Sequence, residues 1–312
     1  MSGMTAVCLG AHVLDVLARP VTEIPEGQGG ALVEEIRLAP AGSAGGTAVT
    51  LAKLDARVLS MGAVGDDPLA DALLVLLAKG GVDTSHLVRK PGVQTSASVL
   101  PIRPNGDRPA LHVIGANSAW TEDDVPWDAI ESATHVHAGA PEIAGPELCA
   151  KVLERARASG ATTSADLLAD GNPGILEWVA PALGHVDHLL INGEQATGLV
   201  EEPDVAAACD ALRGHGPATV AATVGADGAV VASAGGVDRT PAHPVEVVDT
   251  SGCGDAFSAG YLRGLAAGRP IPEAAAMGCA AATFVAGGLG SDAGDFDLAA
   301  VERLAFGDRE GD

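Results

Sequence analysis

The chain has 312 residues, 47% of them hydrophobic, and its 41 acidic residues outnumber 18 lysines and arginines to give a formal net charge of −23. Such a charge repels the phosphates of nucleic acids and anionic lipids, so we exclude nucleic acid and membrane surfaces as partners. No apolar run is long enough to span a bilayer, and no basic region precedes the apolar N-terminal stretch, so we expect no signal peptide. Five scattered cysteines without a C-x-x-C pair indicate reduced thiols and a cytoplasmic protein.

In chain order, short apolar runs alternate with segments of helical spacing, which is the pattern of an α/β protein with a mostly parallel sheet. The expected strands are 5–9, 57–62, 135–138, 161–166, 186–191, 219–224 and 229–233. The expected helices are 46–54, 68–79, 146–159, 174–183, 205–214, 254–267 and 272–286. The length allows one domain or two, but no long linker interrupts this order, so we predict a single domain over residues 1–312.

Two segments, 13–38 and 93–114, break the alternation. They contain β-type runs joined by turn residues such as Asn105-Gly106-Asp107, which is typical of a hairpin tip.

Residues 247–260 read Val-Val-Asp-Thr-Ser-Gly-Cys-Gly-Asp-Ala-Phe-Ser-Ala-Gly and predict a strand, a glycine turn and a helix N-terminus. The free amides and the dipole of such a helix start form an anion site, here at Gly252, Cys253 and Gly254. A carboxylate beside bound phosphate is repelled by it, so Asp255 makes sense as a base that deprotonates a hydroxyl attacking a phosphoryl group. The alternative is an aspartate that caps an ordinary helix.

Other motifs for phosphate, metal and dinucleotide binding are missing from the sequence. There is no G-x-x-x-x-G-K-[ST] loop and no H-E-x-x-H. His135 and His137 alternate along a strand without a convergent third ligand, so we expect no metal there. Gly42, Gly45 and Gly46 lack the dinucleotide spacing, which argues against a dehydrogenase.

The 247–260 segment resembles the C-terminal signature of the ribokinase-like (PfkB) carbohydrate kinases, which reads roughly Asp-Thr-x-Gly-Ala-Gly-Asp. The resemblance continues in family order through 40–52, 62–67, 81–84, 106–108, 115–117 and 223–228, over most of the chain. It implies a three-layer α/β/α ribokinase-like fold. It also implies a small β lid, contributed by 13–38 and 93–114, over the sugar site.

On the substrate side, Asp15 stands in an apolar stretch, where a carboxylate needs hydrogen-bond donors such as sugar hydroxyls. The family places an aspartate there to bind the sugar; the alternative is a surface aspartate at a strand end. Gly42 and Ser43 match positions where the glycine-rich loop touches a polyol. Asn117 binds substrate or only shapes a turn, and Arg108 binds a substrate carboxylate or phosphate or faces solvent.

The resemblance also implies a nucleotide side and a monovalent-cation site, for an ion such as K⁺. The nucleotide side comprises Asn192, Thr223, Gly225 and Gly228. The cation site comprises Asp249 with carbonyls near Ser251, Ala286 and Gly290.

Three positions depart from the family pattern. Gly46 stands where an Asn usually contacts the sugar, which removes a polar contact. The Asn-x-x-Glu motif, which the family links to Mg²⁺ and phosphate through water, ends here in Gln195, so its charge is lost or comes from Glu194. Cys253 replaces the usual Ala, a change that a backbone anion contact tolerates.

These features predict a kinase, dependent on ATP and Mg²⁺, that transfers the γ-phosphoryl group to a hydroxymethyl group of a sugar or sugar-like alcohol. Two alternatives remain: a nucleoside kinase of the same fold, and a catalytically silent sugar- or nucleotide-binding regulator. We also expect a homodimer formed through the lid.

Overall fold

A nine-stranded sheet forms the centre of the protein in the computed structural model, which describes residues 3–307. Its strand order is β13-β12-β11-β10-β9-β8-β1-β4-β5. The strands are β1 (Thr5–Gly10), β4 (Arg57–Gly65), β5 (Asp83–Lys90), β8 (His135–Gly139), β9 (Thr162–Asp166), β10 (His188–Asn192), β11 (Thr219–Thr223), β12 (Ala229–Ser233) and β13 (Gly236–Thr240). Neighbours from β5 to β11 are parallel, whereas the β11–β12 and β12–β13 pairs are antiparallel.

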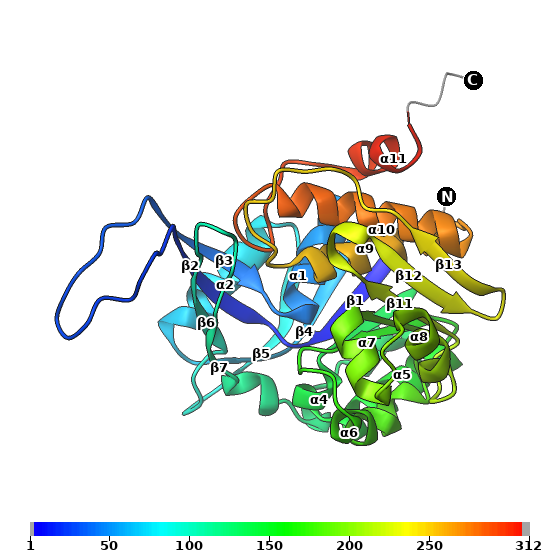
Figure 1. The fold of residues 1–312 in the computed structure, drawn as a ribbon. Coiled ribbons are helices and arrows are strands. Elements are labelled where there is room, and N and C mark those ends of the chain that lie inside the picture. Colours follow the sequence, from blue (N-terminus) through cyan, green and yellow to red (C-terminus); the bar gives the residue numbers. More distant parts are fainter. Residues whose placement is uncertain (1–2, 308–312) are drawn as a thin grey trace.

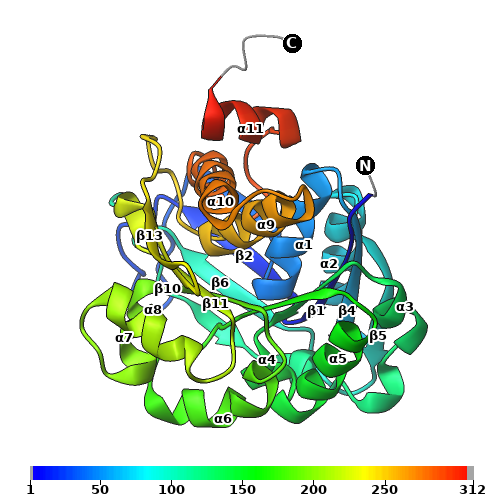
Figure 2. The same cartoon turned by 90° about the vertical axis from the view of Figure 1, so that its right-hand side faces the viewer.

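Helices cover both faces of this sheet (Figure 1, Figure 2). One face carries α1 (Ser43–Lys53), α2 (Pro68–Lys79), α9 (Cys253–Ala266) and α10 (Ile271–Ala286), with α11 (Leu298–Phe306) outside α10. The other carries α3 (Trp127–Ser132), α4 (Pro141–Ala144), α5 (Pro146–Ala158), α6 (Pro173–Leu183), α7 (Gly193–Val200) and α8 (Val205–Arg213). The predicted three-layer α/β/α fold with a mostly parallel sheet is confirmed.

Strand β1 shows why the central strands read as continuous apolar runs. Val7 and Leu9 belong to the core beneath one helical layer, while Ala6 and Cys8 belong to the core beneath the other. Alternate residues of a strand point to opposite faces, so a strand covered on both sides must be apolar at every position. The carboxyl ends of the parallel strands therefore meet at one edge of a rigid layer.

Several elements differ from the prediction. The edge strand β5 was not expected, because exposed polar residues such as Asp83, Ser85 and Arg89 interrupt its apolar pattern. Helix α7 was not predicted, because it has only eight residues and two of them are glycines, which have a low helix propensity. Helix α1 begins at Ser43, earlier than predicted, and contains Gly45 and Gly46.

A second sheet of four strands has the order β3-β2-β6-β7. It consists of β2 (Val13–Arg19), β3 (Glu35–Ala41), β6 (Ala97–Pro101) and β7 (Leu111–Val113). These strands come from the two segments that break the alternation in the sequence. The turn at 105–107 lies between antiparallel β6 and β7, where the Asp107 amide donates to Asn105 Oδ1 (3.1 Å).

The two faces of this small sheet have different chemistry, which follows from its register. Asp15 pairs with Ser98, and Ser98 pairs with His112, so these three side chains form a row on one face. One residue further along each strand, an apolar row lies on the opposite face: Leu38, Val16, Val99 and Leu111. The polar row therefore faces the main sheet and the apolar row faces outward.

Among the residues that the structure describes, we find no helix with the length and hydropathy needed to cross a membrane.

Candidate active site

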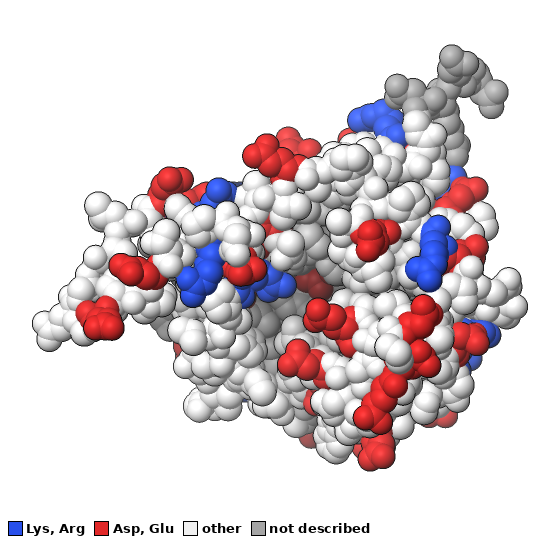
Figure 3. Space-filling view, in the orientation of Figure 1, with Lys and Arg blue, Asp and Glu red and all other residues white. Residues whose placement is uncertain are grey.

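A cavity of about 540 Å³ lies at the carboxyl ends of the central strands, beneath the polar face of the small sheet. Figure 3 shows the hollow on the molecular surface, with a group of basic side chains, accompanied by some acidic ones, on the side of the small sheet and acidic side chains on the opposite side. Its lining includes Asp15, Gly42, Ser43, Ser98, Arg108, His112, Asp166, Asn192, Gln195, Thr223 and residues 250–255. The fold thus brings together residues that lie far apart in the sequence.

The turn at the start of α9 forms one wall of this cavity. Gly252 adopts φ 75°, and a Cβ there would lie 2.5 Å from Cα of Ser291, so only glycine fits. No side chain caps α9, and Gly252, Cys253 and Gly254 all line the cavity. The Cys253 amide donates to the carbonyl oxygen of Thr250 (3.3 Å), but the first amides of a helix lack intrahelical partners, so this wall is still suited to bind an anion.

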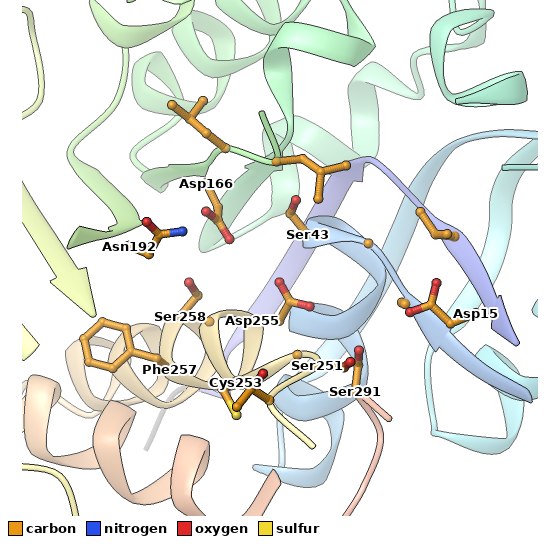
Figure 4. Close-up of a pocket in the computed structure, with 18 of the residues that line it drawn as sticks. Asp15, Ser43, Asp166, Asn192, Ser251, Cys253, Asp255, Phe257, Ser258 and Ser291 are labelled. Atoms are coloured by element: carbon orange, nitrogen blue, oxygen red, sulfur yellow. The ribbon is translucent and has the colours of Figure 1, made fainter. Parts of the chain in front are cut away.

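Asp255 follows this turn, and its carboxylate extends into the cavity towards Ser43 and Asp166 (Figure 4). Burial raises the pKa of Asp255 to about 7; the charge of Asp15 adds to the rise, and Arg108 opposes it. A carboxyl group with this pKa can accept a proton near neutral pH, as a general base must.

Asp15 faces the cavity from β2 and lies in the polar row with Ser98 and His112. Ser98 Oγ and His112 Nδ1 are 3.0 Å apart. Burial raises the pKa of Asp15 to about 6, against a hydrogen bond from Ser98 and the charge of Arg108. This row provides donors and acceptors that suit the hydroxyl groups of a polyol.

Arg108 reaches the cavity from the loop between β6 and β7. Its Nε donates to Thr250 Oγ1 (3.3 Å), which joins the small sheet to the turn that precedes α9. A fixed guanidinium here can bind an anionic group between the two parts of the site.

The residues expected on the nucleotide side separate into two groups. Asn192 and Thr223, at the ends of β10 and β11, line both the main cavity and an adjoining one of about 530 Å³, which Gly225 also lines. Gly228 lines neither cavity. It lies in a tight turn at φ 93°, where a Cβ would be 2.0 Å from the carbonyl oxygen of Thr240, so it shapes the backbone.

Two residues expected on the substrate side lie outside the cavity lining. Gly46 packs against Asp255, where a Cβ would be 2.1 Å from Oδ2. Asn117 is buried, and its Oδ1 accepts a hydrogen bond from the amide of His12 (3.1 Å), so it holds the backbone after β1.

The sequence analysis missed several lining residues, including the polar residues Asp166, Ser98 and His112. Asp166 is the last residue of β9, and burial raises its pKa well above the usual range, with Asp255 adding to the rise. The strand predicted over 161–166 ends on this carboxylate, and that position at the carboxyl end of a strand could have identified Asp166 as a site residue. Ser98 and His112 had none, because their proximity to Asp15 depends on strand register.

Side-chain oxygens that can bind Mg²⁺ lie between the expected substrate side and the expected nucleotide side of the cavity. Asp166 and Asn192 both face the cavity near Asp255 (Figure 4). No group of three or more His, Cys, Asp or Glu among residues 3–307 is arranged to hold a metal alone. Mg²⁺ usually keeps water and substrate phosphates as ligands beside one or two carboxylates, so these residues fit a nucleotide-bound Mg²⁺.

The residues expected to bind a monovalent cation already have hydrogen-bond donors from the protein. Asp249 is fully buried, and its carboxylate already accepts hydrogen bonds from Ser251 N (2.9 Å), Ser251 Oγ (2.8 Å) and Gly290 N (2.9 Å). The carbonyl oxygen of Ala286 accepts from Val248 N (2.9 Å). These donors satisfy the Asp249 carboxylate and the Ala286 carbonyl without a bound cation.

Cys253 is half-buried, whereas the other four cysteines are buried. Burial raises its pKa to about 12, and Asp249 and Asp255 add to the rise against Arg108. The effect of the helix N-terminus does not overcome burial and the carboxylates, so the thiol stays protonated at neutral pH.

Comparison with known proteins agrees with this geometry. Residues 4–295 match the profile of the pfkB family carbohydrate kinases. The chain is 30% identical over 263 residues to the ATP-dependent ribose-1-phosphate kinase of Halopiger xanaduensis, covering 83% of this chain and 84% of that protein. It is 31% identical over 231 residues to the fructoselysine 6-kinase of Escherichia coli, covering 71% and 80%.

Solved structures show the same fold. The adenosine kinase of Sinorhizobium meliloti has a TM-score of 0.83 at 25% identity, with 97% of this chain and 100% of that chain covered. Arabidopsis thaliana ribokinase complexed with ribose and ATP has a TM-score of 0.81 at 20% identity, with 97% and 99% covered. From the family profile and these relatives we conclude that the chain belongs to the pfkB family of carbohydrate kinases.

Proposed function

We propose that the protein transfers the γ-phosphoryl group of ATP to a hydroxymethyl group of a sugar or sugar-like alcohol. The observation that carries this proposal is the placement of Asp255. Its carboxylate follows the glycine turn that starts α9 and extends into the same cavity as Asp15. A base and an anion-binding wall are thereby next to a polyol-binding row.

In this mechanism the Asp255 carboxylate accepts the proton of the acceptor hydroxyl. The hydroxyl oxygen forms a bond to the γ-phosphorus, the bond from that phosphorus to the β,γ-bridging oxygen breaks, and ADP leaves. The amides of 252–254 stabilise negative charge on the transferred group. Bound Mg²⁺ would neutralise phosphate charge, with Asp166 and Asn192 as the protein ligands.

The acceptor would lie between Asp15 and the start of α1. Asp15 would accept hydrogen bonds from sugar hydroxyls, supported by Ser98, while the Gly42–Ser43 backbone and the Ser43 hydroxyl contact the opposite side. ATP would lie along Asn192, Thr223 and Gly225, where the second cavity adjoins the first.

The position of Arg108 favours an acceptor substrate that carries an anionic group. It is the only Lys or Arg that lines the cavity in the described part of the chain. The relatives include enzymes named for a sugar phosphate and for fructoselysine, so sugar phosphates and sugar derivatives belong in the substrate panel.

We further propose that residues 1–312 work as one domain in the cytoplasm, with 13–38 and 93–114 as the lid. The outer face of the small sheet would bind a second copy of the chain. Ile36, Leu38, Val99 and Leu111 are 43–72% exposed there. Copies that each carry a net charge of −23 repel over their acidic surfaces, so an uncharged apolar face is where they can meet. Sedimentation of the wild type and of Leu111→Lys tests this, and a monomeric wild type would contradict it.

The kinase proposal is tested with ATP, Mg²⁺ and a panel of sugars, sugar phosphates and nucleosides. Turnover of one class identifies the acceptor, and Asp255→Asn should then lower kcat at least about a hundredfold while the fold and the ATP affinity persist. Asp123→Asn, at an exposed helical position, is the matched control. An Asp255→Asn enzyme that kept most of its kcat would exclude Asp255 as the base.

A further inference from the structure

The side chain of Gln195 uses both ends of its amide inside the protein. Gln195 is only 7% exposed. Its Nε2 donates to the carbonyl oxygens of Leu167 (2.9 Å) and Ala169 (2.9 Å), and its Oε1 accepts from the amide of Asn192 (2.9 Å). In return, Asn192 Oδ1 accepts from the amide of Gln195 (2.8 Å), which completes a capping box at the start of α7.

The loop that Gln195 holds is also held from its other side. Glu142 Oε1 accepts hydrogen bonds from the amides of Leu168 (2.7 Å) and Ala169 (2.9 Å). The loop is therefore held on the α4 side through the amides of Leu168 and Ala169, and on the α7 side through the carbonyl oxygens of Leu167 and Ala169. An amide side chain supplies two donors for these carbonyl oxygens, whereas a carboxylate supplies none.

The backbones of this loop and of α7 are in direct contact. A Cβ at Gly171 would lie 2.3 Å from the carbonyl oxygen of Gln195, and a Cβ at Gly198 would lie 2.2 Å from that of Gly171. There is no room for water or an ion to separate the loop from the first turn of α7. The side chain of residue 195 is therefore held close to the loop backbone, where a change in its hydrogen bonding acts on the loop directly.

The residue before this loop is Asp166, and the residue that Gln195 caps is Asn192. Both face the cavity (Figure 4), and both are the residues that would meet the nucleotide-bound metal. Gln195 thus fixes the two metal-facing residues of the proposed kinase through its hydrogen bonds to their neighbouring backbone.

We propose that Gln195 is a positioning residue that locks the 167–169 loop to α7, and that this chain requires an amide at this position. The resemblance to the Asn-x-x-Glu motif leads to the opposite expectation, namely that a carboxylate at residue 195 would serve the metal. Here Gln195→Glu would instead place a carboxylate against two carbonyl oxygens, which repel it. The inference rests on the proposed kinase function only where activity is measured.

The experiment compares Gln195→Glu and Gln195→Met with the wild type and with Gln28→Glu, which adds the same charge at an exposed position. We expect both Gln195 variants to melt at least about 4 °C below the wild type. Amide hydrogen exchange in peptides covering 166–172 should increase in both, and kcat/KM should fall at least about tenfold. Gln28→Glu should match the wild type in melting temperature and in the exchange of these peptides.

The pH profile of melting separates this role from metal binding. A carboxyl group facing carbonyl oxygens can donate only when protonated, so its pKa in the folded Gln195→Glu protein would be raised. The melting deficit of Gln195→Glu should therefore shrink towards pH 5.5 and grow towards pH 8.5, whereas that of Gln195→Met should stay constant.

Retained melting temperature and exchange protection in Gln195→Glu, with a higher kcat or a lower Mg²⁺ requirement, would overturn the proposal. A wild type without turnover on the whole substrate panel would contradict the kinase function instead. The melting and exchange results would still decide the role of Gln195 in that case.

Discussion

The Asp255 carboxylate occupies space that exists because residue 46 has no side chain: a Cβ there would lie 2.1 Å from Asp255 Oδ2. Gly46 lies in α1 and Asp255 in the first turn of α9, so the two helices meet at this point. The glycine, which replaces the family's sugar-contacting Asn, therefore determines where the proposed base lies.

Gly46→Ala should displace the Asp255 carboxylate and lower kcat by about tenfold to a hundredfold, because a base must lie within hydrogen-bond reach of its proton. The matched control is Gly45→Ala, where the new Cβ would lie 3.5 Å from His12 Cδ2, an ordinary contact. Both variants should show the circular dichroism of the wild type. Equal kcat for both would show that Gly46 does not control the base.

The pKa of Asp255, raised from 3.8 to about 7, should appear in the pH dependence of the reaction. The free enzyme needs the ionised carboxylate, so kcat/KM should rise with pH up to about 7 and then level off. Asp15 adds to the rise in this pKa, so Asp15→Asn should move the midpoint to lower pH for whatever activity remains. An unchanged midpoint in that variant would contradict the coupling.

The same pKa affects stability. The folded protein binds this proton more tightly than the unfolded chain, so the contribution of Asp255 is complete below about pH 4 and is lost as pH rises through about 7. Asp255→Asn should therefore melt above the wild type at pH 8, with a smaller difference at pH 5. A melting temperature below that of the wild type at pH 8 would contradict the burial of this charge.

Substrate should order the proposed lid, because closure removes water that would compete as acceptor. Hydrogen exchange in 13–38 and 93–114 should slow at saturating substrate in the wild type. Arg108→Ala should lose this effect at the 93–114 segment and raise KM, since it removes the contact to Thr250. The control is Arg103→Ala. The guanidinium of Arg103 lies in the same loop region and donates to the carbonyl oxygen of Thr22. Unchanged exchange in both segments would mean that the lid does not close.

Alkylation of Cys253 should inactivate the enzyme, because the adduct would fill the space that the γ-phosphate needs. The high thiol pKa makes the reaction slow at neutral pH and faster in alkaline buffer. MgATP should protect, and Cys253→Ala should be active and resistant. Mass-spectrometric mapping checks this, and equal modification of Cys253 with and without MgATP would contradict the anion-site assignment.

Activity should not depend on K⁺, because the loop after α10 is already held by a fixed cation. Lys53 Nζ donates to the carbonyl oxygens of Asp292 (2.8 Å), Ala293 (3.0 Å) and Gly294 (2.6 Å). We expect kcat to agree within about twofold in potassium, sodium and tetramethylammonium salts. Lys53→Met should lower the melting temperature, whereas Lys79→Met, at the end of α2, should not. A several-fold activation by K⁺ would contradict this expectation.

The parts of the site that the sequence predicts are those encoded by neighbouring residues. The glycine turn and Asp255 lie within four residues of each other, so their spacing alone indicates an anion-binding wall. Asp15 was predicted from its apolar surroundings. Ser98 and His112 were not, because each is a single polar residue in a strand, and only sheet register brings them to the cavity. Asp166 was not singled out either, although it ends a predicted strand.

Gln195 shows the same limit in another form. The Asn-x-x-Gln spacing of a capping box is visible in the sequence, but its second role depends on carbonyls of Leu167 and Ala169 that only the folded chain brings near. Gly46 is a further example, since its effect on the position of Asp255 depends on how closely α1 approaches α9.

The alternation of the small sheet restricts how its specificity can change. Ser98 faces the cavity, while Val99 faces outward. Inserting one residue within β6 would exchange these faces, placing apolar side chains over the acceptor and polar ones outside. New acceptor preferences in this lineage can therefore arise by substitution within the strands, whereas the connection at 20–34, which lacks regular structure, can change in length without altering the register.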